Sequence, residues 1–370
     1  MISIPSFAKI NLGLKIGVRR PDGFHELRTI YQTVALHDSI GVEVQGGSGI
    51  EVRCSDPRVP RDETNTCWKI SEQVLRTLPR RLKPDTGQGL RGAPFGKLRA
   101  GSEGAPLQRK VVVEIEKNLP VQGGLGAASS NAVATMLALE RALGVQVSPA
   151  EELRIAAEVG SDLPLFLIGG TVLGLGRGEQ VHALPDLPTL HLVIITPLIG
   201  VSTPRAFARW DELSAQQPEL TRSEGAGTMN ELSGSVLDLL SEGFPQADAA
   251  KAAVEFGGRK AEFASGVPAG GGDRAETLLL DLVRTGIEND FERVVFPEYP
   301  ELREVKELLQ REGAQFASLS GSGSTLYGVF KSADEASACA ERMRAAGHAA
   351  VATRSLARGE YWEAIGTTPP

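Results

Sequence analysis

The sequence has few of the features that mark secreted or membrane-bound proteins. Its three cysteines, Cys54, Cys67 and Cys339, are too few and too scattered for a disulfide framework or a zinc cluster, so we expect reduced thiols. No apolar run is long enough to cross a membrane, and no signal or transit peptide precedes the first predicted strand. We therefore expect a cytoplasmic protein of the bacterial type.

Positive charge and aromatic side chains are also scarce. The formal net charge is -7, and aromatic residues make up 5% of the chain. Proteins that bind nucleic acids usually present a basic face to the phosphates and aromatic rings to the bases, so the composition argues against a nucleic-acid partner. A chain of 370 residues is long enough for two domains with separate cores.

The most informative stretch that is present is LPVQGGLGAASSN, residues 119–131. It follows an apolar strand predicted at residues 111–116 and leads into a helix predicted over Ala127–Leu143, which Gly144 ends. The free N–H groups and the positive dipole end of such a helix bind phosphate. The glycines match neither a P-loop nor the dinucleotide fingerprint, and a flexible turn is the alternative. The flanking strand and helix favour a nucleotide site.

The opening segment, residues 8–16, alternates with a period of two. It predicts a strand that carries Lys9 and Asn11 on one face and apolar residues on the other. Capping boxes at Ser148 and Ser332 begin two predicted helices. Further strands are predicted at residues 27–36, 39–44, 192–196, 315–319, 325–330 and 349–352.

These elements predict an α+β protein in two halves, a domain at residues 1–185 and a domain at residues 186–370. Glycine- and proline-rich stretches at residues 80–109 and 256–274 interrupt the periodic segments. We interpret both as loop insertions, one in each half.

Four elements have the residue types that phosphoryl transfer requires: Lys9 with Asn11, the loop at residues 123–130, Asp162, and the glycine-serine turn at residues 320–324. Such a reaction needs backbone N–H donors, a lysine, a carboxylate and usually a magnesium ion. In this combination and order the chain resembles the GHMP kinase superfamily. The motifs that carry the resemblance are AKINLGL at 8–14, RPDGFHEL at 20–27, LPVQGGLGAASSNAV at 119–133, GSDLPLFL at 160–167, VSTPRAF at 201–207, NDFE at 289–292 and LSGSGSTLYGVF at 319–330.

The resemblance implies a two-domain GHMP kinase fold, with an N-terminal β/α domain like ribosomal protein S5 and a C-terminal ferredoxin-like α/β domain. It implies ATP as phosphoryl donor, together with Mg²⁺ for which Ser129 or Ser130 could supply a hydroxyl. The implied ATP-binding residues are Pro120, Gly123, Gly124, Leu125, Gly126, Ala127, Ala128, Ser129 and Ser130.

For catalysis, the resemblance implies that Asp162 accepts the proton of the acceptor hydroxyl or orients that hydroxyl. Lys9 would hold Asp162 ionised and stabilise charge at the reacting centre, because a nearby cation lowers a carboxylate pKa. The alternatives are structural: Asp162 as a helix N-terminal residue stabilised by the dipole, and Lys9 as a solvated strand lysine.

The turn in RPDGFHEL resembles one member in particular, whose acceptor is the 2-hydroxyl of 4-diphosphocytidyl-2-C-methyl-D-erythritol, in non-mevalonate isoprenoid precursor synthesis. It implies that His25 binds the cytosine and that Phe24 and Phe207 sandwich the base. Core packing of Phe207 and a turn-capping role for His25 are the alternatives. The remaining expected contacts come from Asn11 and Thr203 on the sugar-alcohol and diphosphate side, and from Gly321, Ser322 and Gly323 near the phosphates or substrate. Tyr31 is expected near the pocket, or as a half-buried strand residue.

Two other functions compete with this one. The first is another small-molecule kinase of the superfamily, such as a mevalonate or homoserine kinase. His25 with Phe24 and Phe207 argues against it, because those substrates have no base to sandwich. A catalytically silent nucleotide sensor on the same fold would be indicated by loss of Lys9 or Asp162, and both are present.

Overall fold

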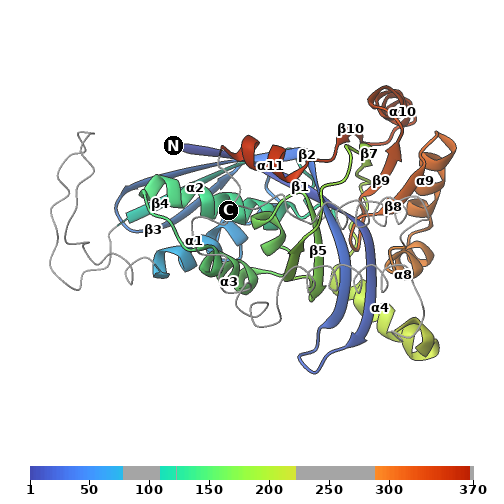
Figure 1. Cartoon of the computed structure of the whole chain (residues 1–370), viewed down its shortest axis with the longest axis horizontal. Coiled ribbons are helices and arrows are strands. Elements are labelled where there is room, and N and C mark those ends of the chain that lie inside the picture. Colours follow the sequence, from blue (N-terminus) through green and yellow to red (C-terminus); the bar gives the residue numbers. More distant parts are fainter. Residues whose placement is uncertain (78–108, 122, 222–287, 367–370) are drawn as a thin grey trace.

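The computed structural model describes residues 1–77, 109–121, 123–221 and 288–366 (Figure 1). The predicted loop insertions at 80–109 and 256–274 lie outside these residues, except for Arg109. Cys54, Cys67 and Cys339 are buried and unpaired, so the prediction of free thiols is confirmed. In the described ranges, no helix combines the length and apolar character needed to span a bilayer.

The first sheet belongs to the N-terminal half and has the order β3-β4-β2-β5-β6, with β1 paired to β2. Its strands are β1 (Ile2–Arg19), β2 (His25–Gly46), β3 (Gly49–Cys54), β4 (Arg109–Glu116), β5 (Thr171–Gly176) and β6 (Gln180–Ala183). Only β3 and β4 pair in parallel. Helix α2 (Ala127–Leu143) packs on β1 and β2, and α1 (Thr66–Thr77) packs on α2 and on α3 (Pro149–Val159).

The second sheet is antiparallel and has the order β10-β7-β9-β8, from β7 (His191–Ile195), β8 (Phe316–Leu319), β9 (Leu326–Phe330) and β10 (Ala350–Arg354). If these four strands are numbered 1 to 4 in chain order, the order in the sheet is 4-1-3-2. This is the strand order of a ferredoxin-like domain, which is the fold predicted for the C-terminal half. Helices α9 (Pro300–Arg311) and α10 (Ala333–Ala345) pack on the sheet, and α4 (Thr203–Gln216) packs on α8 (Glu292–Glu298). Two short 3-10 helices, η2 (Pro164–Leu167) and η3 (Pro218–Leu220), complete the described helices along with α11.

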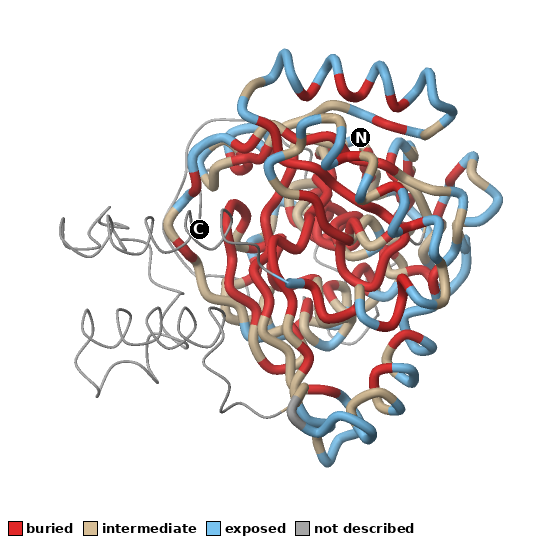
Figure 2. The backbone as a smooth tube through the Cα atoms, turned by 90° about the vertical axis from the view of Figure 1, so that its right-hand side faces the viewer, coloured by how far each residue is buried: buried red, intermediate tan, exposed pale blue. Residues whose placement is uncertain are grey.

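The long strand β1 ties the two halves together. Ile4 and Phe7 belong to the core under α2, Ile10 to the core between the sheets, and Leu14 and Ile16 to the core of the second half. Buried residues therefore form a continuous interior, with exposed residues along the outer helix faces and in the loops (Figure 2).

The last described helix, α11 (Arg358–Ile365), returns to the N-terminal half. The Tyr361 hydroxyl donates to the Phe166 carbonyl at 2.7 Å, and the Trp362 indole donates to the Ile168 carbonyl at 2.9 Å. The domain boundary between residues 185 and 186 stays a prediction. It falls between the last strand of the first sheet and the first strand of the second.

Two expectations about the opening strands need correction. Residues 27–36 and 39–44 are parts of one strand, β2, which bends rather than breaks because it pairs with β1 along nearly its whole length. The solvated alternative for Lys9 is wrong: Lys9 is 3% exposed and Asn11 2%. The period-two alternation of residues 8–16 cannot show that a second layer of the structure covers the face of the strand that carries Lys9 and Asn11.

A buried ion pair fixes the chain just before the glycine loop. Asp38 is fully buried, and its carboxylate accepts from Lys117 Nζ at 2.5 Å and from the Asn118 and Leu119 amides at 2.7 Å. It also accepts from Asn131 Nδ2 on α2 at 3.0 Å. One carboxylate thus holds both ends of the loop.

We predict that Asp38→Asn destabilises the protein by about 3–5 kcal/mol, because it leaves the Lys117 ammonium buried without its counter-charge. Equilibrium urea unfolding measures the change. The control is Glu114→Gln, which removes an exposed partner of Arg53 and should cost no more than about 1 kcal/mol. Equal effects of the two substitutions would contradict the role given to Asp38.

Candidate active site

The centre of the site is the side chain of Lys9 on β1. Its ammonium donates to Asn11 Oδ1 at 2.6 Å and lies 3.6 Å from Asp162 Oδ2. Asp162 lies in the turn between α3 and η2, and its side chain is 35% exposed. A buried ammonium therefore faces a carboxylate that an incoming ligand can reach. Burial lowers the pKa of Lys9, and the charge of Asp162 opposes that shift.

Tyr31 on β2 completes this centre. Its hydroxyl donates to Asp162 Oδ1 at 3.2 Å, and the Lys9 ammonium lies 5.6 Å from the centroid of its ring. Burial, with the nearby charge of Asp162, raises the pKa of Tyr31 well above its ordinary value, so the hydroxyl keeps its proton. Tyr31 is 2% exposed, so it orients Asp162 and is not a half-buried surface residue.

The glycine loop lies directly beside Lys9. The Lys9 amide donates to the Leu125 carbonyl at 3.0 Å, and Gly126 is the N-cap of α2 with φ of 70°. A Cβ on Gly126 would lie 3.1 Å from Lys9 Cγ, so only glycine lets the loop approach this closely. The Ser129 and Ser130 amides donate to the Gly126 carbonyl, at 3.0 and 2.9 Å. Among the described residues, the Ala127 and Ala128 amides at the start of α2 have no acceptor, so they are the donors left for a ligand.

The glycine-serine turn after β8 packs against the same loop. The Ser320 hydroxyl donates to the Gly124 carbonyl at 3.0 Å, and the Thr325 amide donates to the Gly123 carbonyl at 3.1 Å. Gly124 has φ of 81°, and a Cβ there would lie 2.1 Å from the Ser320 carbonyl oxygen. The two halves of the chain therefore meet through two glycine-rich segments.

The motif NDFE, at residues 289–292, holds that turn in place. Asn289 Nδ2 donates to the Leu319 and Gly321 carbonyls, both at 2.8 Å, while Glu292 Oε1 accepts from the Leu319 amide at 2.9 Å. The motif therefore holds the glycine-serine turn in position, and its contacts imply no direct contact with a ligand.

The two loop serines differ in what they contact. The Ser130 hydroxyl is 2.7 Å from the Ser6 hydroxyl, and Ser130 is 2% exposed. Ser129 lies one position earlier and is partly exposed. In the described residues, no group of three or more His, Cys, Asp or Glu side chains could hold a metal ion.

Near the tip of the β1–β2 hairpin, His25 stacks on Phe207 of α4. Their ring centroids are 4.9 Å apart and the planes differ by 10°. His25 Nε2 is 2.7 Å from Asp211 Oδ1, and among the described residues no hydrogen bond of its ring caps a turn. Phe207 also packs edge-on against Phe291, so it belongs to the core on one side and contacts His25 on the other.

Phe24 lies in the turn before β2. It is 50% exposed, and the Arg177 guanidinium carbon lies 4.9 Å from its ring centroid. The expected sandwich of a base between Phe24 and Phe207 stays a prediction.

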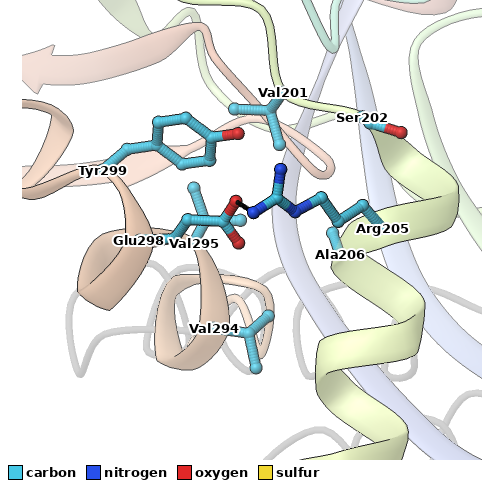
Figure 3. A pocket seen from close by; sticks show the side chains of 8 residues that line it. All are labelled: Val201, Ser202, Arg205, Ala206, Val294, Val295, Glu298 and Tyr299. Carbon is cyan, nitrogen blue, oxygen red and sulfur yellow. Dashed lines mark ion pairs between the residues drawn. The ribbon is translucent and has the colours of Figure 1, made fainter.

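Helix α4 supplies a row of contacts at one-turn intervals. Thr203, Phe207 and Asp211 are spaced i, i+4 and i+8, so they share a face. The Thr203 hydroxyl lies 2.7 Å from the Ser322 hydroxyl of the glycine-serine turn. On the other side of α4, Arg205 pairs with Glu298 of α8 at 2.6 Å across a small pocket between the helices (Figure 3). Helix α4 lies beside the β1–β2 hairpin (Figure 1), and Asp211 contacts His25 of that hairpin.

The structure therefore brings most of the predicted site residues together in two clusters. One contains Lys9, Asn11, Asp162 and the loop at 123–130, with the glycine-serine turn packed against that loop. The other contains His25 and Phe207. Thr203, on the same face of α4 as Phe207, contacts Ser322 of the glycine-serine turn. The sequence reasoning did not find Thr29, which accepts from Asn11 Nδ2 at 2.7 Å, or Asp211. Neither lies in a recognisable motif.

Known proteins share this sequence and architecture. The chain matches the family models for the GHMP kinases N terminal domain, over residues 96–170, and for GHMP kinases C terminal, over residues 275–349. The 4-diphosphocytidyl-2-C-methyl-D-erythritol kinase of Moorella thermoacetica is 29% identical over 96% of this chain and 99% of its own. That of Acaryochloris marina is 30% identical over 92% of this chain and 90% of its own. The chain belongs to the 4-diphosphocytidyl-2-C-methyl-D-erythritol kinase family of the GHMP kinases.

The fold agrees with that of the family. A crystal structure of a 4-(cytidine 5'-diphospho)-2C-methyl-D-erythritol kinase superposes with a TM-score of 0.62, at 23% identity, over 96% of this chain and 99% of the other. The predicted two-domain α+β GHMP kinase fold is confirmed. As a member of this kinase family, the chain is an ATP-dependent phosphotransferase with a small-molecule alcohol as acceptor.

We predict that Gly124→Ala raises the KM for ATP about tenfold or more, because the new Cβ pushes the loop away from the Ser320 carbonyl. Steady-state kinetics with ATP varied measures the effect. Gly144→Ala is the matched control: Gly144 also has a positive φ, of 62°, but nothing lies within 4 Å of its Cβ position. It should lower stability by about 1 kcal/mol and leave the KM for ATP unchanged. If both variants change that KM equally, backbone strain and not close approach is responsible.

Proposed function

We propose that this enzyme transfers the γ-phosphoryl group of ATP to the 2-hydroxyl of 4-diphosphocytidyl-2-C-methyl-D-erythritol, in non-mevalonate isoprenoid precursor synthesis. The observation that carries the proposal is the Lys9–Asp162 pair at 3.6 Å, next to the N-terminus of α2, with Lys9 on the same β1–β2 hairpin as His25. The names of the relatives point to the same acceptor.

In this reaction Asp162 orients the acceptor hydroxyl and accepts its proton as the oxygen attacks the γ-phosphorus. Tyr31 and Lys9 hold the carboxylate from two sides, through the contacts at 3.2 Å and 3.6 Å. The ammonium of Lys9 and the free amides at the start of α2 stabilise the charge on the transferred phosphoryl group. ADP leaves, and the acceptor keeps the phosphoryl group.

Magnesium fits this set of donors when most of its ligands come from the triphosphate. The partly exposed Ser129 hydroxyl at the start of α2 is a hard oxygen ligand, which suits Mg²⁺. Ser130 is the poorer candidate, because its hydroxyl is buried against Ser6. When bound, the ion would neutralise charge on the phosphate oxygens.

Cytosine recognition is assigned to His25 and Phe207, with Phe24 at the edge of the base site. In the pair, whose ring centroids are 4.9 Å apart, the imidazole edge is the polar group and the Phe207 ring supports the face of the imidazole. A mevalonate or homoserine acceptor would make no use of it. The proposal further includes the cytoplasm as the compartment and no nucleic-acid partner, on the basis of the bacterial relatives and the net charge of -7.

The test of the proposal is ADP release by the purified protein with ATP and magnesium. Acceptors are 4-diphosphocytidyl-2-C-methyl-D-erythritol, mevalonate, homoserine and galactose, and mass spectrometry identifies the product. We expect turnover with the cytidine compound alone. Turnover with a different acceptor would overturn the assignment of His25 and Phe207, and ATP binding without any turnover would favour the silent nucleotide sensor.

We predict that Asp162→Asn binds ATP with nearly wild-type affinity but loses at least about a hundredfold in kcat, because the amide cannot accept the proton. Isothermal titration and single-turnover kinetics separate the two effects. The control is Asp186→Asn, whose carboxylate accepts from the Arg358 amide and lies outside both site clusters. Wild-type turnover in Asp162→Asn would remove that carboxylate from the mechanism.

The pH–rate profile should report the state of Lys9. Burial lowers its pKa, so the ammonium is lost as pH rises through a value below that of an exposed lysine, and activity should fall there. In Lys9→Arg the residual activity should lack this basic limb, since a guanidinium does not deprotonate. An unchanged basic limb in that variant would assign it to another group.

A further inference from the structure

Asp211 on α4 has a specific contact that no motif explains. Its Oδ1 lies 2.7 Å from Nε2 of His25, whose side chain is 6% exposed, whereas the Asp211 side chain is 39% exposed. The other carboxylate oxygen is 3.8 Å from the Arg19 guanidinium. Asp211 is therefore a partly solvated carboxylate with one short contact, to a buried imidazole.

This contact decides which nitrogen of a neutral His25 carries the hydrogen. An ionised carboxylate only accepts hydrogen bonds, so Nε2 must donate. The other nitrogen, Nδ1, is then an acceptor, and no described residue donates to it. A histidine held in this way offers the lone pair of Nδ1 to a hydrogen-bond donor on the edge of a ligand.

Phe207 fixes the same ring in a second way. Phe207 and Asp211 are one turn apart on α4, and the Phe207 ring stacks nearly parallel to the imidazole, with 10° between the planes. A base that is hydrogen-bonded edge to edge with His25 would lie close to the plane of the imidazole. One helix face therefore sets both the plane and the acceptor edge of the ring.

We infer that Asp211 is a positioning residue that makes the base site select a pyrimidine with a 4-amino group over one with a 4-keto group. The inference rests on the proposed function, because it assumes that the acceptor carries a cytosine. The amino group of cytosine donates to Nδ1, whereas the 4-carbonyl of uracil would place an acceptor against an acceptor. Asp211 acts through His25 and needs no contact with the substrate.

The first experiment measures the tautomer directly, by ¹⁵N NMR of the imidazole nitrogens in the full-length protein without ligand. The wild-type protein should show His25 with hydrogen on Nε2 and a bare Nδ1. Asp211→Asn should lose this preference, because an amide can donate to Nε2 as well as accept from it. Hydrogen on Nδ1 in the wild-type protein would overturn the inference.

The second experiment compares the cytidine acceptor with its uridine analogue. In Asp211→Asn the kcat/KM for the cytidine acceptor, divided by that for the uridine analogue, should fall about tenfold, because one hydrogen bond is lost. The fall should come from a higher KM for the cytidine acceptor. The kcat with the cytidine acceptor and the KM for ATP should stay near wild type. Asp211→Glu keeps a carboxylate and should recover part of the selectivity. Glu212→Gln, next along the helix and paired only with exposed Arg209, should change nothing.

The outcomes separate the two proposals. Turnover of the cytidine acceptor by wild-type protein, with an unchanged selectivity ratio in Asp211→Asn, overturns the role of Asp211 and leaves the proposed function intact. Equal losses with both acceptors would show a purely structural role and also overturn it. A wild-type protein that phosphorylates neither acceptor removes the proposed function, and the selectivity inference with it.

Discussion

An ammonium group buried in a protein must have a counter-charge and hydrogen-bond acceptors beside it, and this constraint organises the site around Lys9. Lys9 is 3% exposed on a strand that both halves of the chain cover. Asn11 supplies the hydrogen bond and Asp162 the charge, at 2.6 Å and 3.6 Å. The same arrangement leaves the carboxylate exposed to a ligand, with the ammonium beside it, so a requirement of folding also creates the pair to which we assign the reaction.

The second constraint is close approach between backbones. Gly124 and Gly126 bring the glycine loop against the Ser320 carbonyl and the Lys9 side chain, where a Cβ would lie 2.1 Å and 3.1 Å from the nearest of these atoms. Asp38 anchors the loop from the first half and Asn289 holds the opposing turn in the second half. The proposed nucleotide end of the site is therefore held by hydrogen bonds from both halves of the chain. The proposed acceptor end depends instead on the packing of one face of α4 against the β1–β2 hairpin.

The sequence predicted local elements better than the contacts between them. Helix α2 was placed at Ala127–Leu143 and is found there, because glycines bound it at both ends. The roles of Lys9 and Asp162 came from the family resemblance, since alternation cannot show that a second layer buries a strand lysine. Asp211 was missed: it lies 186 residues from His25 along the chain and looks like any polar residue of an amphipathic helix. The stacking of Phe207 on His25 was likewise beyond prediction, because it depends on how α4 packs on the hairpin.

The central claim is that the Lys9–Asp162 pair receives the acceptor hydroxyl. A crystal structure with a non-hydrolysable ATP analogue, magnesium and 4-diphosphocytidyl-2-C-methyl-D-erythritol tests it most directly. The account predicts the 2-hydroxyl oxygen within about 2.6–3.2 Å of an Asp162 carboxylate oxygen, in line with the γ-phosphate. An acceptor whose 2-hydroxyl faces a different side chain, with Asp162 still held only by Lys9 and Tyr31, would contradict it.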